Sequence, residues 1–181
     1  MARRTPRASA RPEPDARALL WAPWRSAYIG KVPTGCIFCF GRIGAEARRR
    51  RLVLNAGRLV FVMLNRYPYN NGHLMVAPRR HVASPELLTR EERIELGDFV
   101  ARAVSRLRAA YRPAGLNVGA NLGRAAGAGI ADHLHWHLVP RWEGDNNFMP
   151  VIGSTRVLPQ SLADTYALLE PLFKTIDTDL S

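Results

Sequence analysis

Three of the five histidines in this chain stand at alternate positions of one short run, "ADHLHWHLVP" at residues 131–140. Residues two apart lie on the same face of an extended strand, so His133, His135 and His137 are predicted to present their imidazoles together. A neutral imidazole can attack phosphorus through its free nitrogen when an acceptor holds its other nitrogen. The spacing predicts a nucleophile with histidine partners. Two alternatives are partly exposed histidines without a ligand, and three rings that share one metal.

A second group of potential ligands begins at Cys36 and Cys39, the only cysteines of the chain. Two cysteines cannot form a disulfide framework, and their C-x-x-C spacing is typical of metal or redox sites. A structural zinc ion needs four ligands, which His81 and one histidine of the run could complete. The alternative is a pair of reduced cysteines packed under the N-terminal segment.

The elements that must position these groups follow from periodicity and turn residues. Residues 58–64 and 73–78 are predicted strands of an antiparallel hairpin, and residues 115–121 form another strand. Between them, residues 91–111 have the apolar period of an amphipathic helix, and Thr89 with Glu92 has capping-box spacing. A glycine-rich loop at 123–129 leads into the histidine run, either as an anion-binding loop or as simple tight turns.

The ends of the fold are predicted from weaker patterns. Residues 42–51 are expected to form a short basic helix, and a last helix starts at Ser161 and Asp164, which Pro171 bends or ends. This order of elements indicates an α+β fold, an antiparallel sheet with helices on one face.

Composition and charge narrow the class of protein. The chain has 181 residues, enough for one domain, and 47% of them are hydrophobic. We expect residues 1–17 to be a disordered basic arm and residues 18–181 to be a single domain. The net charge of +11 favours an anionic partner, although the arginine runs are also compatible with solvated surfaces. No membrane span or signal peptide is evident, so a cytoplasmic location is expected.

The motifs together resemble one family. The run "HLHWHLV" is similar to the His-φ-His-φ-His-φ-φ signature of the histidine-triad (HIT) superfamily of nucleotide hydrolases and transferases. "MLNRYPYNNGHLMVAPRRHV" resembles that family's nucleotide-binding hairpin, and "CIFC" resembles its zinc half-site. "LWAPWRSAYI" and "RWEGDNNFMPVIGSTRVLPQSL" resemble the flanks of its diadenosine tetraphosphate phosphorylase branch. The resemblance implies the HIT-like fold, an antiparallel sheet with a long amphipathic helix and a C-terminal helix. It also implies a homodimer formed through the sheet edge or the long helix.

The resemblance also implies roles at matching positions. His135 would attack the α-phosphorus of a nucleotide and form a nucleotidyl-histidine intermediate, and His137 would contact the α-phosphate and assist the leaving group. A backbone carbonyl around His73 would fix the tautomer of His135. The implied ligands of a structural zinc ion are Cys36, Cys39, His81 and His133. The expected nucleotide contacts are His137, Asn65 at the ribose, Asn121 at the phosphates, and Phe61 and Leu64 among the walls of the base pocket.

One position departs from the family's pattern. Many of its hydrolases carry glutamine or serine just before the triad, whereas this chain has Gly129, Ile130 and Ala131. The smaller wall leaves room for a second anion, so we expect inorganic phosphate as the acceptor and phosphorolysis of diadenosine tetraphosphate to ADP and ATP. Hydrolysis of dinucleoside polyphosphates or adenylyl conjugates to AMP is the alternative reaction. A zinc-stabilised nucleic-acid-binding module, using arginines and tryptophans, is the alternative of another class.

Overall fold

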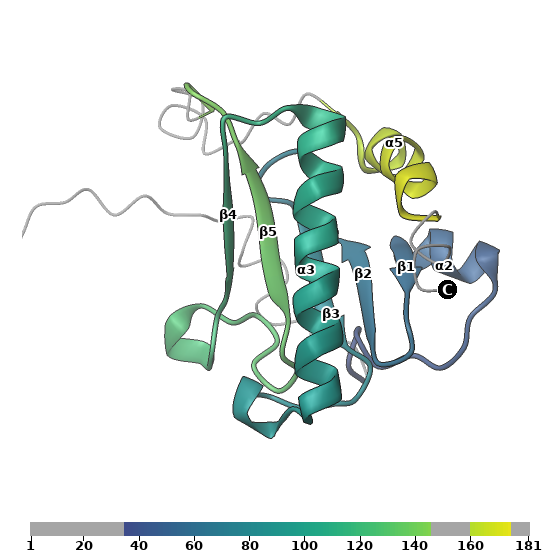
Figure 1. Ribbon diagram of the computed structural model, residues 1–181, viewed down its shortest axis with the longest axis vertical. Helices are drawn as coiled ribbons and strands as arrows, with labels where there is room; N and C mark the ends of the chain where they lie inside the picture. The colour runs from purple at the N-terminus through teal and green to yellow at the C-terminus, as the bar shows by residue number, and fades with distance from the viewer. Residues whose placement is uncertain (1–34, 146–159, 175–181) are drawn as a thin grey trace, which may run out of the picture.

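A five-stranded antiparallel sheet carries the chemistry-bearing residues. The computed structural model describes residues 35–145 and 160–174, and its strands are ordered β1-β2-β3-β5-β4 (Figure 1). The strands are β1 (Val53–Ala56), β2 (Val60–Leu64), β3 (Leu74–Pro78), β4 (Gly115–Ala120) and β5 (Trp136–Arg141). The helices are α2 (Ala45–Arg51), α3 (Arg90–Tyr111) and α5 (Leu162–Lys174), with 3-10 turns at Pro85–Leu87 and Arg124–Ala126. The predicted α+β fold is confirmed.

The long helix α3 starts at the predicted capping box. The hydroxyl of Thr89 accepts a hydrogen bond from the backbone N–H of Glu92 at 3.2 Å, and the Glu92 carboxylate accepts one from the N–H of Thr89 at 2.8 Å. The helix ends where Arg112 adopts a left-handed conformation with a φ of 45°. Between these points, α3 lies across β2, β3 and β5, which places a continuous apolar stripe on the sheet (Figure 1).

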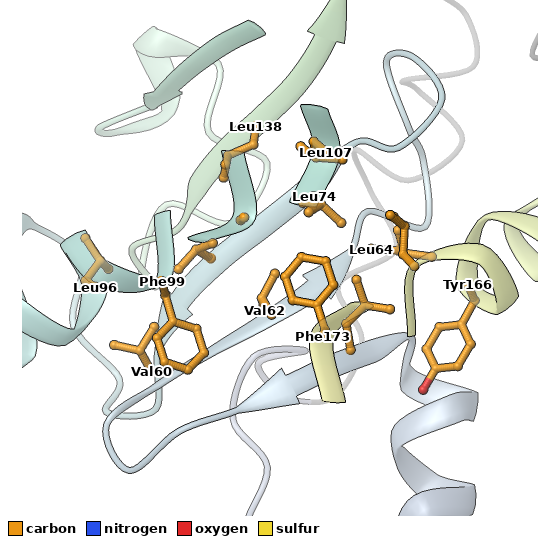
Figure 2. Packing of buried hydrophobic residues seen from close by; sticks show 14 residues of the cluster. Val60, Val62, Leu64, Leu74, Leu96, Phe99, Leu107, Leu138, Tyr166 and Phe173 are labelled. Carbon is orange, nitrogen blue, oxygen red and sulfur yellow. The ribbon is translucent and has the colours of Figure 1, made fainter. Parts of the chain in front are cut away.

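Alternate residues of β2 and β3 face this helix and build the larger core. Val60, Val62 and Leu64 point from β2 into a cluster that α3 and α5 close from the other side (Figure 2). Pro171 lies inside α5 and does not end it, since the helix continues to Lys174. Figure 2 labels the principal members of this cluster: Val60, Val62, Leu64, Leu74, Leu96, Phe99, Leu107, Leu138, Tyr166 and Phe173.

The opposite face of the sheet carries a smaller apolar cluster that supports the candidate site. It contains a phenylalanine from the C-x-x-C segment together with the intervening residues of β1, β2 and β3. We call it the site-face cluster, and its buried members are Phe38, Val53, Phe61, Met63, Met75 and Ala77. The two faces of β2 and β3 therefore differ: one packs into the larger core, and the other supports the candidate site.

The structure corrects two strand assignments. The strand predicted over 131–140 begins only at Trp136, because the N–H of Leu134 donates to the carbonyl of Val82, 2.6 Å away, instead of joining a strand ladder. Strand β1 was not predicted, because its residues Val53, Leu54 and Asn55 are consecutively buried and show no alternation. Asn55 fits there because its side-chain amide donates to the carbonyl of Phe173 at 2.6 Å.

Several expectations lie outside the described residues. The basic arm at 1–17, the N-terminal segment "LWAPWRSAYI", and residues 146–159 of the C-terminal flank belong to the parts of the chain that the structure does not describe. Among the helices that it does describe, none combines the length and apolarity needed to cross a lipid bilayer.

Candidate active site and metal centre

The three histidines of the run come together as the spacing predicts. His137 lies in β5 opposite Met75 of β3, and its ring centroid is 4.9 Å from that of His135. His133 and His135 precede the strand, yet both rings contact Phe38 on the same side of the sheet. The shared face is therefore confirmed, although only His137 belongs to a regular strand.

His135 is held in one tautomer by its own segment. Its Nδ1 lies 2.8 Å from the backbone carbonyl oxygen of His133, and because a carbonyl only accepts, Nδ1 carries the proton. Nε2 of neutral His135 therefore keeps its lone pair. Burial lowers the pKa of His135, and the hydrogen bond to His133 opposes that shift. The ring is thus favoured in its neutral, nucleophilic form.

The acceptor differs from the expected one. A carbonyl around His73 was predicted to bind His135, but the His73 carbonyl accepts the backbone N–H of Asn65 at 3.0 Å. The acceptor is instead the carbonyl of His133, two residues before His135. Residues 133–135 do not belong to a strand, so this oxygen is not used in the sheet and accepts from the ring. The prediction of a fixed tautomer holds, while the predicted source was wrong.

His73 acts through its side chain on His137. The backbone N–H of Tyr69 donates to Nδ1 of His73 at 3.0 Å, which leaves the proton of neutral His73 on Nε2. That nitrogen lies 2.9 Å from Nδ1 of His137 and donates to it. Neutral His137 must then carry its own proton on Nε2. The site pairs a nucleophilic nitrogen on His135 with a hydrogen-bond donor on His137.

Phe38 is a site residue that sequence reasoning missed. Its side chain is 1% exposed, and its ring centroid lies 4.8 Å from that of His135 and 5.1 Å from that of His133. The available signal was an aromatic residue between the two cysteines of "CIFC", a segment that was interpreted only for its thiols. Phe38 supplies the apolar wall that desolvates the nucleophile.

The expected base-pocket residues separate onto two faces. Phe61 belongs to the site-face cluster, whereas Leu64 belongs to the core under α3 and α5. Because side chains alternate along a strand, residues 61 and 64 of one strand cannot share a face. The assignment of Leu64 to the pocket is therefore wrong. Met63 and Met75 lie on the same face of the sheet as Phe61, and the sequence-based prediction missed them.

Of the remaining predicted nucleotide contacts, Asn65 lies beside His73. The side-chain oxygen of Asn65 accepts from the N–H of Tyr67 at 2.9 Å, and its amide nitrogen is 3.4 Å from Nδ1 of His73. Asn121 follows the last residue of β4, whose pairing partner is Trp136. Gly129 is exposed, in the loop between Asn121 and the histidine run.

A second group of side chains, beside the candidate active site, consists of two thiols and two imidazoles. Cys36, Cys39, His81 and His133 each offer a ligand atom, and all four atoms lie within 4.8 Å of one another. Nδ1 of His133 is 3.3 Å from Sγ of Cys36 and 3.2 Å from Nδ1 of His81. Sγ of Cys39 is 3.2 Å from that nitrogen of His81. The predicted grouping of these four residues is confirmed.

The donor set fits a tetrahedral zinc ion. Bonds of about 2.0–2.3 Å give tetrahedron edges of about 3.3–3.8 Å, close to the observed separations. Nε2 of His133 donates to the carbonyl of Pro78 at 2.8 Å, so the lone pair of neutral His133 is on Nδ1, facing the thiols. Desolvation and then the neighbouring Cys36 raise the pKa of the Cys39 thiol, and a bound cation would favour its thiolate form.

Comparison with known proteins places the chain in a family. Residues 49–144 match the HIT domain model. The chain is 44% identical over 163 residues to the AP-4-A phosphorylase of Mycobacterium tuberculosis, covering 86% of this chain and 84% of that protein. A histidine triad nucleotide-binding protein of Sulfolobus tokodaii, described as hypothetical, superposes with a TM-score of 0.57 at 25% identity, covering 80% of this chain and 93% of its own.

A Zn-bound histidine triad protein of Mycobacterium smegmatis has the same fold. It superposes with a TM-score of 0.55 at 18% identity and covers 87% of this chain and 96% of its own. Fold, histidine geometry and sequence similarity agree. The chain belongs to the HIT domain family, and it is an enzyme of that family's nucleotidyltransferase or hydrolase type.

Proposed function

We propose that this enzyme transfers a nucleotidyl group from a dinucleoside polyphosphate, diadenosine tetraphosphate, to inorganic phosphate through His135, releasing ATP and ADP. The observation that carries the proposal is the 2.8 Å hydrogen bond from Nδ1 of His135 to the His133 carbonyl, which leaves Nε2 free to attack. The similarity to a relative named AP-4-A phosphorylase supports the choice of substrate.

In the first step, Nε2 of His135 attacks the α-phosphorus. The new P–N bond forms while the bond from phosphorus to the bridging oxygen breaks, and the electron pair leaves on the terminal oxygen of ATP. The imidazole becomes cationic, and the His133 carbonyl that accepts its Nδ1–H stabilises this charge. Because a terminal phosphate has a pKa near 6, it can leave as an anion. A hydrogen bond from Nε2–H of His137 then suffices, without full proton transfer.

In the second step, an oxygen of inorganic phosphate attacks the same phosphorus. The P–N bond breaks, its electron pair returns to Nε2 of His135, and the AMP unit leaves as ADP. The exposed Gly129 before the triad has no side chain that would compete for the space of this second anion. Asn65 would bind the ribose hydroxyls, Asn121 the phosphates, and Phe61 with its neighbours the base.

We propose that Cys36, Cys39, His81 and His133 bind a structural zinc ion. Thiolate and imidazole ligands suit zinc, and four protein ligands leave it no open position, so it would stabilise the fold around His135 and take no part in the transfer. The ligand His133 supplies its ring to the metal and its carbonyl to His135. Zinc would in this way fix the oxygen that sets the tautomer of the nucleophile.

We also propose that the enzyme is a homodimer paired through the edge of the sheet. Strand β4 is an edge strand of the described sheet, since β5 is its neighbour on one side, and its Val118 side chain is 45% exposed. Such an edge can pair with a second copy. Light scattering of the purified protein tests this, and a monomer at micromolar concentration would contradict it. The cytoplasmic location stays a prediction.

Product analysis tests the reaction. Purified protein is incubated with diadenosine tetraphosphate, with and without inorganic phosphate, beside His135→Asn as the inactive blank. ADP and ATP formed only with phosphate would support phosphorolysis, and wild-type protein quenched in alkaline detergent should carry an AMP adduct that acid releases. AMP and ATP formed regardless of phosphate would show that water is the acceptor and would contradict the argument from Gly129.

A further inference from the structure

Tyr69 contacts both histidines of the hydrogen-bonded pair. It lies in the loop between β2 and β3, and its ring centroid is 4.6 Å from that of His73 and 5.8 Å from that of His137. The rings of Tyr69 and His137 stack with an interplanar angle of 26°. Its backbone N–H donates to Nδ1 of His73 at 3.0 Å. Tyr69 therefore supplies both the backbone donor that sets the tautomer of His73 and a ring that packs against the pair of histidines.

The residue after Tyr69 connects its loop to β5 and to the turn that follows β5 by hydrogen bonds. The side-chain amide of Asn70 donates to the carbonyl of Pro140 at 3.2 Å and to the carboxylate of Asp145 at 2.9 Å. Gly72 has a φ of +70°, and a Cβ there would lie 2.7 Å from the ring of Tyr111, so this position requires glycine. These contacts hold the backbone of the loop, so a change of the Tyr69 side chain alters the ring without releasing the N–H.

We propose that Tyr69 is a positioning residue for His137, which keeps Nε2–H directed at the leaving oxygen. The proposal rests on the proposed function. The 2.9 Å bond between His73 and His137 fixes a tautomer only while both rings keep their orientation. A ring stacked on His137 restricts its rotation and excludes water that would compete for Nδ1. Without it, His137 would sample orientations in which its donor no longer reaches the leaving group.

Leaving groups of different basicity test this role. Tyr69→Leu removes the aromatic ring but keeps the backbone donor, and Tyr69→Phe keeps the ring. We expect Tyr69→Leu to lower kcat/KM, which reports the first step, by about 3- to 10-fold with the basic 4-methoxyphenyl ester of AMP, the range of one aromatic pair. The loss should be smaller with the 4-nitrophenyl ester, whose leaving group needs less stabilisation. Tyr69→Phe should restore most of the turnover of the basic ester. Equal losses on both esters, or no rescue by phenylalanine, would overturn the proposal.

A spectroscopic measurement separates this proposal from the proposed function. Nitrogen-15 NMR of the full-length protein at fixed pH reports which ring nitrogen of His137 carries the proton, without any substrate. Wild type should show the Nε2–H tautomer, and Tyr69→Leu should show averaged shifts. An unchanged spectrum in Tyr69→Leu would overturn the role of Tyr69. Failure of wild type to turn over diadenosine tetraphosphate would instead overturn the proposed function.

Discussion

The cluster of thiols and imidazoles and the candidate active site both take histidines from residues 133–137. They differ in which ring nitrogen points toward the neighbouring thiols or toward the substrate. His133 donates from Nε2 to the Pro78 carbonyl and turns Nδ1 toward the thiols. His135 donates from Nδ1 to the His133 carbonyl and keeps Nε2 for the substrate. Two residues of the same type, two positions apart, therefore receive opposite tautomers. A backbone carbonyl, more than the histidine itself, decides what each ring can do.

Phe38 lies where the two sites meet. It stands between the cysteines in sequence, and its ring contacts both His133 and His135. The comparison therefore gives two kinds of variant: those that should affect one site alone, and those at the boundary that should affect both.

The largest effect is expected on the reaction site alone. His135→Asn removes the nucleophile, so we expect turnover of diadenosine tetraphosphate to fall by at least about 10⁴-fold, as for other nucleophile deletions. Because no metal ligand is touched, bound zinc and the melting temperature should stay close to wild type. Initial rates and metal analysis by mass spectrometry check both parts. Loss of zinc in this variant would show that the two sites cannot be separated.

The reciprocal change acts on the metal side. Cys39→Ser removes one of four ligands, so we expect zinc content to fall from about one ion per chain to near zero. Loss of a structural metal should lower the free energy of unfolding by on the order of 4 kcal/mol. Metal analysis and urea denaturation measure these effects. Full zinc occupancy in the variant would contradict the assignment of Cys39 as a ligand.

A change at the boundary should affect both sites. Phe38→Ala leaves a cavity beside His133 and His135 and should cost about 3–4 kcal/mol of stability. We also expect weaker zinc retention and slower turnover at a temperature where the variant is folded. Phe99→Ala is the matched control, because Phe99 is also buried, in the core on the opposite face of the sheet. Equal behaviour of both variants in zinc content and turnover would remove the special role of Phe38.

The smallest effect concerns the support of the metal side. The carboxylate of Glu92 is 2.7 Å from Nη2 of Arg80, which precedes the proposed zinc ligand His81, and this hydrogen bond lowers the pKa of Glu92. The stabilisation is fully present above the unfolded pKa of about 4.3 and is lost as pH falls through the lower folded pKa. Glu92→Gln should cost about 1–2 kcal/mol at pH 7.

Urea denaturation between pH 2 and pH 7 checks this sign. The difference in stability between wild type and Glu92→Gln should shrink as the pH falls below about 4. Asp98→Asn changes an exposed carboxylate further along the same helix and serves as the control. A gap between wild type and Glu92→Gln that is constant across this range would argue against an ionised Glu92 as the source of the stability.

Patterns between residues close in sequence were enough to predict several features of the fold and the site. The alternation of His133, His135 and His137 was enough to predict that their rings meet, because the side-chain period of extended backbone is two. The capping box of Thr89 and Glu92 was also predictable, because it involves residues only three apart. The alternation of residues along β2 also held the information that Phe61 and Leu64 face opposite sides, although that signal was not applied.

The sequence by itself determined that histidines, thiols and an antiparallel sheet would be present, because residue type and short-range periodicity are local properties. Only the tertiary structure decided which ring nitrogen of His133 and of His137 carries the proton. That choice depends on the Pro78 carbonyl, 55 residues from His133, and on the N–H of Tyr69, whose effect reaches His137 through His73. The contacts of His133 with Pro78 and of His137 with His73 join the segments of β3 and β5, so they form only when these strands pair. Backbone carbonyls and N–H groups are chemically alike along the chain and acquire a role only from their position.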